Sequence, residues 1–70
     1  LSDNNVALEQ FEEYYSQYPN GTYIQEVLYQ LTLLSNQIDT QKSKKYANIL
    51  IENFPNSIYA NNNIQSIARN

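Results

Sequence analysis

The residues best suited to chemistry in this sequence are three closely spaced carboxylates, Glu9, Glu12 and Glu13. Carboxylates can transfer protons or hold a cation through their oxygen atoms. A cation site of oxygen ligands needs several groups that converge on a structured loop. These three residues instead fall within a stretch of helical periodicity. We therefore interpret them as a solvated helical face rather than as a catalytic or metal site.

Most groups that enzymes use are missing from the chain. It contains neither cysteine nor histidine, which removes disulfides, thiolate metal sites and the commonest general base. A lone glycine, Gly21, rules out a glycine-rich phosphate loop. Without histidine, the following serines lack their usual activating base: Ser16, Ser35, Ser43, Ser57 and Ser66. We expect no enzymatic activity, no cofactor and no bound metal.

The length and the charge of the chain limit the size of the domain and the classes of partner it can bind. The 70 residues are enough for one small domain, spanning 1–70. The net charge is −3, from 4 Lys+Arg against 7 Asp+Glu, and no basic stripe is present, so we expect no nucleic-acid partner. No apolar run approaches the roughly 18 residues of a membrane span. The chain begins at Leu1 and lacks methionine, so we expect it to be a fragment or a processed piece.

A repeated phrase organises the rest of the sequence. The stretch Tyr18–Tyr23 (YPNGTY) returns 36 positions later as Phe54–Tyr59 (FPNSIY). Each copy is an aromatic residue, a proline, a turn pair and a tyrosine, and apolar residues at helical spacing lie on both sides. Asn20-Gly21 is also a hairpin signal, and Asn20-Gly21-Thr22 matches a glycosylation sequon. The helical flanks favour a turn that leads into a helix, and a repeated helix–stop–helix unit is typical of a helical solenoid.

The apolar pattern predicts an all-α fold of four antiparallel helices that form two hairpins. Their expected ranges are about 3–18, 22–35, 41–53 and 57–69. Ser2 or Asp3 is expected to cap the first helix, with Asn4 or Asn5 as substitutes. Asp39 or Thr40 is expected to cap the third helix, and Asn56 or Ser57 the fourth. Asn36 is expected to end the second helix in a left-handed conformation.

Four apolar stripes are expected to form the core. The third helix repeats the spacing of the first, which places Tyr18 and Phe54 at equivalent positions beneath their turns. The stripes are Ala7, Phe11, Tyr14 and Tyr18; Ile24, Val27, Leu28, Leu31 and Leu34; Ser43, Ala47, Leu50 and Phe54; and Ile64 and Ile67.

Several polar and aromatic residues allow two interpretations. Lys42, Lys44 and Lys45 are interpreted as a solvated face, with a contact to the glutamates of the first helix and a basic binding patch as alternatives. Tyr14, Tyr18 and Tyr46 lie on apolar stripes and are predicted in the core. The tyrosines nearer the helix flanks are equally compatible with packing or recognition, and these are Tyr23, Tyr29 and Tyr59.

The spacing of these residues resembles a known family. The run Ala7-x3-Phe11-x2-Tyr14-x4-Pro19 is similar to the second half of a tetratricopeptide repeat, and the third helix repeats it more loosely. The conventional repeat has 34 residues, and the two additional residues here fit best in the loop near Gln37. The resemblance implies a second helix, a complete helix pair and a final first helix.

The junction phrases YPNGTY and FPNSIYA are similar to those of bacterial envelope tetratricopeptide proteins. These include outer-membrane assembly lipoproteins, the periplasmic protein of the Tol–Pal system and large repeat proteins of Bacteroidetes. The resemblance implies a non-catalytic scaffold, in the periplasm or at the cell envelope, that binds a protein or peptide. Alternatives are a capping or dimerisation piece of a longer solenoid, self-association through repeat ends, and a carbohydrate-binding groove.

The resemblance also implies where a partner binds, since the first helix of each pair lines the concave side. Residues offset from the buried stripes of the second and fourth helices are then the candidate site. They are nearly uncharged and lack the basic clamp for chaperone tails, so we expect hydrogen bonds, aromatic contact and weak salt dependence. The candidates are Tyr23, Glu26, Gln30, Leu33, Tyr59, Asn62, Asn63, Ser66 and Arg69.

Overall fold

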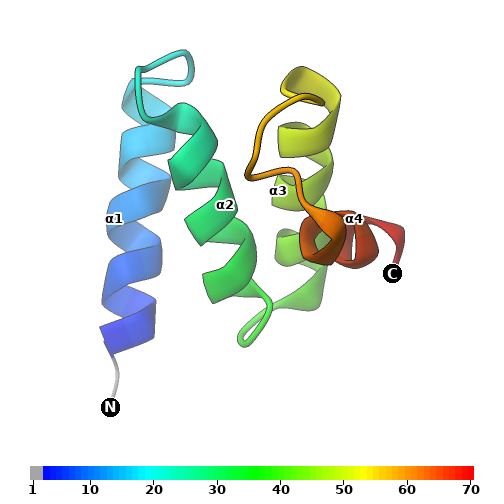
Figure 1. Cartoon of the computed structure of the whole chain (residues 1–70). Coiled ribbons are helices and arrows are strands. Elements are labelled where there is room, and N and C mark those ends of the chain that lie inside the picture. Colours follow the sequence, from blue (N-terminus) through cyan, green and yellow to red (C-terminus); the bar gives the residue numbers. More distant parts are fainter. Residues whose placement is uncertain (1–2) are drawn as a thin grey trace.

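The computed structural model describes residues 3–70, and these residues form four α-helices and no strand (Figure 1). The all-α prediction is confirmed. The bounds of the first three helices agree with the expected ranges to within two residues, whereas the fourth helix starts five residues later than expected. Ser2, a candidate cap, lies outside the described residues. The helices are α1 (Asp3–Gln17), α2 (Ile24–Ser35), α3 (Thr40–Asn53) and α4 (Asn62–Arg69).

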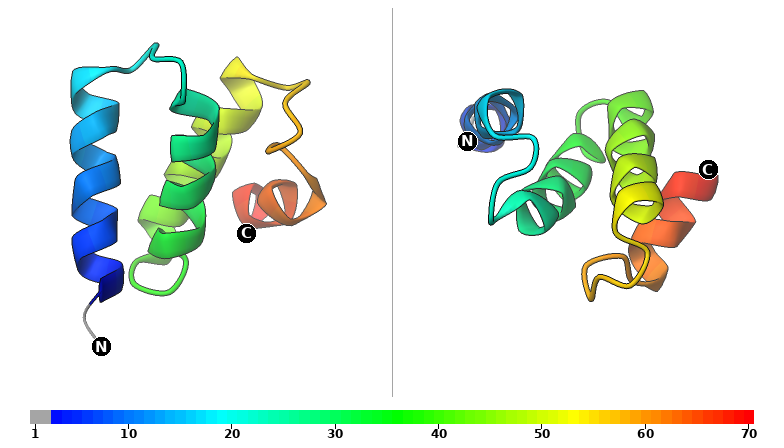
Figure 2. Two further views of the ribbon diagram at one scale, coloured as in Figure 1. Left: turned by 60° about the vertical axis from the view of Figure 1, so that its left-hand side comes forward. Right: turned by 90° about the horizontal axis from the view of Figure 1, so that it is seen from above.

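The helices form two layers. Helices α1, α2 and α3 run side by side in alternating directions, whereas α4 lies across α3 (Figures 1 and 2). The expectation of four antiparallel helices is therefore wrong for α4. Seen from above, α1 and α3 lie on one side of the molecule, and α2 and α4 lie on the other (Figure 2).

The two junctions between helices share the same backbone hydrogen bonds. At each junction a carbonyl of the ending helix accepts the N–H of the residue before proline, and two successive turns follow. The first junction has Tyr18 N–H to Tyr14 O (2.8 Å), Gly21 N–H to Tyr18 O (3.0 Å) and Ile24 N–H to Gly21 O (3.2 Å). The second has Phe54 N–H to Leu50 O (2.9 Å), Ser57 N–H to Phe54 O (3.1 Å) and Ala60 N–H to Ser57 O (3.1 Å).

The two junctions diverge after these shared turns. Helix α2 starts at Ile24, at the end of the second turn, but its counterpart Ala60 is not helical. Instead Asn61 caps α4, because its side-chain oxygen accepts the N–H of Ile64 at 3.0 Å. Asparagine is among the strongest capping residues, and Gln25 stands at this position in the first junction. The predicted caps Asn56 and Ser57 are therefore wrong, since both lie in the turns.

In the loop between α2 and α3, the predicted cap Asp39 is confirmed, but the conformation predicted for Asn36 is wrong. The carboxylate of Asp39 accepts the N–H groups of Gln41 and Lys42 at 3.1 and 3.3 Å. Asn36 has a φ of −60° and a ψ of −23°, so the predicted left-handed conformation is wrong. The carbonyl of Ser35 ends the helix instead, by accepting the N–H of Ile38 at 2.9 Å and that of Asp39 at 2.7 Å.

The core lies on both sides of α2, which contacts α1 and α3. The stripe of α2 is buried as predicted except for Leu34, which is half-buried. Small residues let α3 approach closely, and the buried hydroxyl of Ser43 donates to the carbonyl of Thr32 at 2.8 Å. None of the helices among residues 3–70 is long and apolar enough to cross a membrane. The fully or nearly fully buried members of the core are Leu28, Leu31, Thr32, Ser35, Ser43, Ala47, Leu50 and Ile64.

Tyr18 and Phe54 do not occupy equivalent environments, so the expected equivalence of these two aromatic residues is wrong. Tyr18 is 56% exposed, whereas its counterpart Phe54 is half-buried against the core. The centre of the Tyr18 ring lies 5.3 Å from that of Tyr14, which belongs to α1. The prediction that Tyr18 belongs to the core is therefore wrong, although its backbone makes the expected junction.

Gly21 is required by a close contact and not by its backbone angles, because no described residue has a positive φ. A Cβ atom at this position would lie 2.6 Å from the hydroxyl of Tyr14 and 3.1 Å from the Cβ of Tyr18. In the second junction Ser57 replaces Gly21, and the shorter Leu50 replaces Tyr14. The two exchanges are compatible, since the shorter side chain leaves space for the serine.

We predict that Gly21→Ala lowers the free energy of unfolding by about 1–3 kcal/mol, because the new methyl group is overpacked against Tyr14. Adding Tyr14→Phe removes the hydroxyl that the methyl group meets, so the double variant should lose less than the sum of the single changes. Urea unfolding of the four proteins of this cycle measures the coupling. Additive losses would show that Tyr14 is not the reason for glycine.

Candidate binding surface

Seven of the nine predicted site residues lie on α2 or α4, Tyr23 directly precedes α2, and Tyr59 lies in the linker before α4. The members on α2 recur at spacings of three and four, which places them along one helical face. Most of the nine are accessible to a partner. Tyr23, Glu26, Asn62, Asn63, Ser66 and Arg69 are exposed, and Gln30, Leu33 and Tyr59 are half-buried.

The two predicted tyrosines differ in their surroundings. Tyr59 packs its ring against Tyr29 of α2, with ring centres 5.3 Å apart and planes at 45°. Its N–H also donates to the hydroxyl of Ser57 at 3.1 Å, so Tyr59 anchors the linker between α3 and α4. Tyr23 is 64% exposed and offers its ring to solvent. Tyr23 is thus free for recognition, while Tyr59 is partly committed to the fold.

The opposite layer is joined by a polar bridge between α1 and α3. One carboxylate oxygen of Glu12 accepts the hydroxyl of Tyr46 at 2.8 Å and pairs with the ammonium group of Lys42 at 3.0 Å. The ring of Tyr15 meets that of Tyr46 edge-on, with centres 6.1 Å apart. The alternative of a contact between lysine and the glutamates is therefore confirmed for Lys42. Lys44 and Lys45 are exposed, as expected of a solvated face.

The pKa values of two groups in the bridge, Glu12 and Tyr46, are shifted from their ordinary values. Burial raises the pKa of Glu12, but hydrogen bonds from Lys42 and Tyr46 and the positive charge of Lys42 outweigh it, so the pKa lies below the ordinary 4.5. Burial raises the pKa of the Tyr46 phenol above its ordinary value, and the hydrogen bond to Glu12 and the charge of Glu12 add to this increase. At neutral pH the carboxylate is ionised and the phenol is protonated, which suits the bridge to holding α1 against α3.

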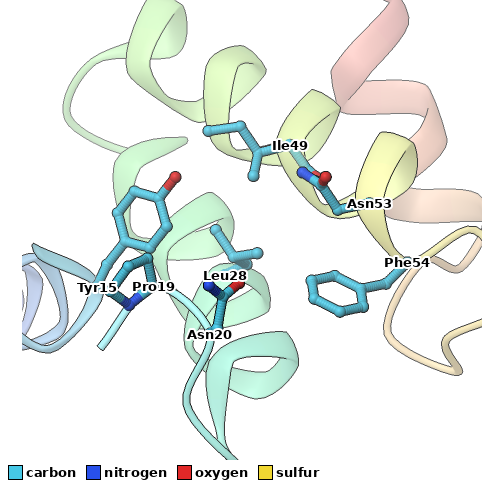
Figure 3. A pocket seen from close by; sticks show the side chains of 7 residues that line it. All are labelled: Tyr15, Pro19, Asn20, Leu28, Ile49, Asn53 and Phe54. Carbon is cyan, nitrogen blue, oxygen red and sulfur yellow. The ribbon is translucent and has the colours of Figure 1, made fainter. Parts of the chain in front are cut away.

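A cleft of about 360 Å³ opens near the first junction (Figure 3). Tyr15 and Phe54 stand on either side of it, and the nearly fully buried Leu28 lies between them. None of the nine predicted site residues lines this cleft. The sequence pattern had singled out the junction residues only as turn formers, because their closeness to α3 depends on the packing of α1 and α3 over α2. The lining consists of Tyr15, Pro19, Asn20, Leu28, Ile49, Asn53 and Phe54.

Comparison of the chain with known protein families, curated proteins and solved structures finds no match. Within residues 3–70 no group of three or more carboxylate side chains is arranged to hold a metal ion.

We predict that the Glu12 bridge stabilises the fold at neutral pH and that this contribution is lost in acid. Because the folded pKa of Glu12 is lowered, its contribution is present above the ordinary pKa of about 4.5 and disappears as the pH falls through the folded value. Glu12→Gln should lower the free energy of unfolding at pH 7 by up to about 1 kcal/mol, since the pair is partly solvated.

Urea unfolding at pH 7 and pH 3 tests this expectation, with Glu9→Gln as the matched control on the exposed face of α1. The wild type and the Glu12 variant should differ at pH 7 and converge at pH 3, whereas the Glu9 variant should follow the wild type more closely at both. A Glu12 effect equal to that of Glu9 at pH 7 would contradict the bridge.

Proposed function

We propose that this chain is a tetratricopeptide-like module that acts as a non-catalytic protein-binding scaffold. The observation that carries the proposal is the recurrence of three junction hydrogen bonds at a spacing of 36 residues. Successive helices also alternate between two layers, and α1 and α2 form an antiparallel hairpin, whereas α4 crosses α3 (Figure 2). A repeat of this kind builds an extended surface from equivalent helices, and such surfaces serve to bind other chains.

The proposed ligand is a protein or peptide segment that contacts the α2–α4 layer. This surface offers the ring of Tyr23, the amide groups of Gln30, Asn62 and Asn63, and few charges. Tyrosine supplies a large contact area with a polar tip, and amides pair with peptide groups. Binding should therefore depend only weakly on salt, because few ion pairs are available for screening.

The proposed location is the bacterial periplasm or cell envelope. Its support is the similarity of the junction phrases YPNGTY and FPNSIYA to those of envelope tetratricopeptide proteins. A scaffold at this location would bind protein partners outside the cytoplasm.

A second candidate role is that of a polar end piece in a longer stack. The observation that favours it is the outer face of α4, where the exposed residues are polar, and a repeat array requires a polar end to remain soluble. The two roles compete on α4, since Asn62, Asn63 and Ser66 belong both to this end face and to the proposed ligand surface. The exposed residues of α4 are Asn62, Asn63, Gln65, Ser66 and Arg69.

The experiment begins with the selection of peptides from a random display library against the intact chain. Tyr23→Ala should weaken a selected peptide by about 2 kcal/mol, as expected of an aromatic contact residue, with little change in thermal midpoint because the ring is mostly exposed. Tyr18→Ala is the matched control, since it removes an exposed tyrosine outside the predicted surface. Tyr59→Ala is unsuitable as a clean test because its ring packs on Tyr29.

Amide chemical shifts of the bound chain locate the ligand. The proposal expects perturbations along α2 and α4, centred near Gln30 and Ser66. Equal losses in the Tyr23 and Tyr18 variants, or perturbations confined to the cleft beside Phe54, would contradict the proposed surface.

A further inference from the structure

The first junction contains the only glycine of the sequence, and this glycine directly follows an asparagine. In an Asn-Gly pair the main-chain nitrogen of the glycine can attack the side-chain amide of the asparagine, because the glycine has no Cβ to hinder the approach. Asn20 is exposed and lines the cleft beside Phe54, so water reaches its side-chain amide (Figure 3). The pair therefore has the composition of a site at which a chain modifies itself.

The packing of the first junction selects glycine at position 21. A Cβ atom there would lie 2.6 Å from the hydroxyl of Tyr14 and 3.1 Å from the Cβ of Tyr18. The Tyr14 hydroxyl also accepts the N–H of Tyr23 at 3.4 Å, which helps to keep it at this place. The contact that fixes the junction thus leaves Asn20 beside the residue that protects it least.

The second junction provides a comparison within the same molecule. Asn56 is exposed and stands 36 positions after Asn20 in the repeated phrase. Its turn is closed by the equivalent hydrogen bond, from the N–H of Ser57 to the carbonyl of Phe54 at 3.1 Å. The side chain of Ser57 hinders attack by its own nitrogen. The two asparagines therefore share exposure and turn hydrogen bonds, and they differ in the residue that follows.

The folded junction restrains the attacking nitrogen. The N–H of Gly21 donates to the carbonyl of Tyr18 at 3.0 Å, and the carbonyl of Gly21 accepts the N–H of Ile24 at 3.2 Å. The attack requires the Gly21 nitrogen to lose its proton and to turn toward the side chain of Asn20, and both hydrogen bonds oppose this. The reaction therefore has to proceed through local opening of the junction.

We propose that Asn20-Gly21 is a self-modification site whose rate is set by opening of the first junction. The Gly21 nitrogen loses its proton and bonds to the Cγ of Asn20, the Cγ–Nδ2 bond breaks, and ammonia leaves with a proton. Water then adds to either carbonyl carbon of the resulting succinimide ring, which opens to aspartate or isoaspartate at position 20. This inference goes beyond the proposed ligand surface, because it concerns the chemistry of the chain alone.

The two products differ in their effect on the junction. Aspartate keeps the course of the main chain and adds one negative charge to the net charge of −3. Isoaspartate leads the main chain through the former side chain, which inserts a methylene group before Gly21. This insertion displaces the Gly21 N–H from the carbonyl of Tyr18, so isoaspartate should weaken the connection of α1 with α2.

The test incubates the purified intact chain at pH 7 and pH 9, with and without denaturing urea. Mass spectrometry of peptides, with electron-transfer fragmentation, measures aspartate and isoaspartate at positions 20 and 56. Ser57→Gly is the matched variant, since it gives Asn56 the same following residue as Asn20. Freshly purified Asn20→Asp is the control for added charge on an unaltered main chain.

The proposal expects Asn20 to react first, with Asn56 intact when half of Asn20 is converted. Ser57→Gly should make Asn56 react as well. Denaturing urea should accelerate the reaction of Asn20 about tenfold or more, since each 1.4 kcal/mol of opening free energy lowers the open population tenfold. The rate should rise from pH 7 to pH 9, because the attacking nitrogen has to be deprotonated. The separated isoaspartate form should unfold at a lower urea concentration than Asn20→Asp.

Three results would overturn the proposal. Equal conversion of Asn20 and Asn56 in the original chain would show that glycine is not the cause. Equal rates for Asn20 in the folded and the denatured chain would show that the junction does not control the reaction. An Asn20 that stays intact even in urea would remove the site itself. These results leave the proposed ligand surface untouched, because its test measures binding.

Discussion

The fold depends on α2, which has to bury apolar side chains against α1 on one side and against α3 on the other. Leu28 and Leu31 of its stripe are almost completely removed from water. The close approach of α3 relies on small residues, with Ser43 and Ala47 both fully buried. The Ser43 hydroxyl meets the Thr32 carbonyl, so the only hydrogen-bonding group that this serine brings into the interface has a partner. A larger side chain at either position would separate the two helices, because packed interiors have little spare volume.

The remaining contacts divide between the two layers. The layer of α1 and α3 is joined by the Glu12 bridge and by the rings of Tyr15 and Tyr46. In the layer of α2 and α4, Tyr29 of α2 instead contacts Tyr59 of the linker before α4, with the two ring planes at 45°. The Glu12 bridge is electrostatic and depends on the ionisation of Glu12, whereas the contact of Tyr29 with Tyr59 is between aromatic rings. The layer that we propose to bind a ligand thus keeps its shape without using its few charges.

The two junctions show how one repeated phrase is adapted to different surroundings. Gly21 accommodates the hydroxyl of Tyr14, and Ser57 is accommodated by the shorter Leu50. Both sets of turns have the same hydrogen bonds, but Asn61 then starts α4 later than α2 starts in the first unit. The longer linker is followed by α4 lying across α3, with polar residues on its exposed face (Figure 1).

The sequence by itself determined the elements that depend on neighbours along the chain. Helical periodicity identified four helices and buried residues such as Leu28, Leu31 and Ile64, and capping chemistry identified Asp39. The resemblance to a tetratricopeptide repeat, combined with this periodicity, placed the candidate surface on and beside α2 and α4, and all but three of its residues are exposed. These features were accessible because propensity, spacing and capping act over a few residues.

Only the tertiary structure decided the features that depend on residues far apart in the chain. The direction of α4, the contact of Tyr59 with Tyr29 and the cleft between Tyr15 and Phe54 all follow from how the helices pack. Tyr18 lies on an apolar stripe yet is exposed, because no described helix covers that flank of α1. Periodicity states which face of a helix is apolar, but burial requires a second element to cover that face, and only the packed chain supplies it.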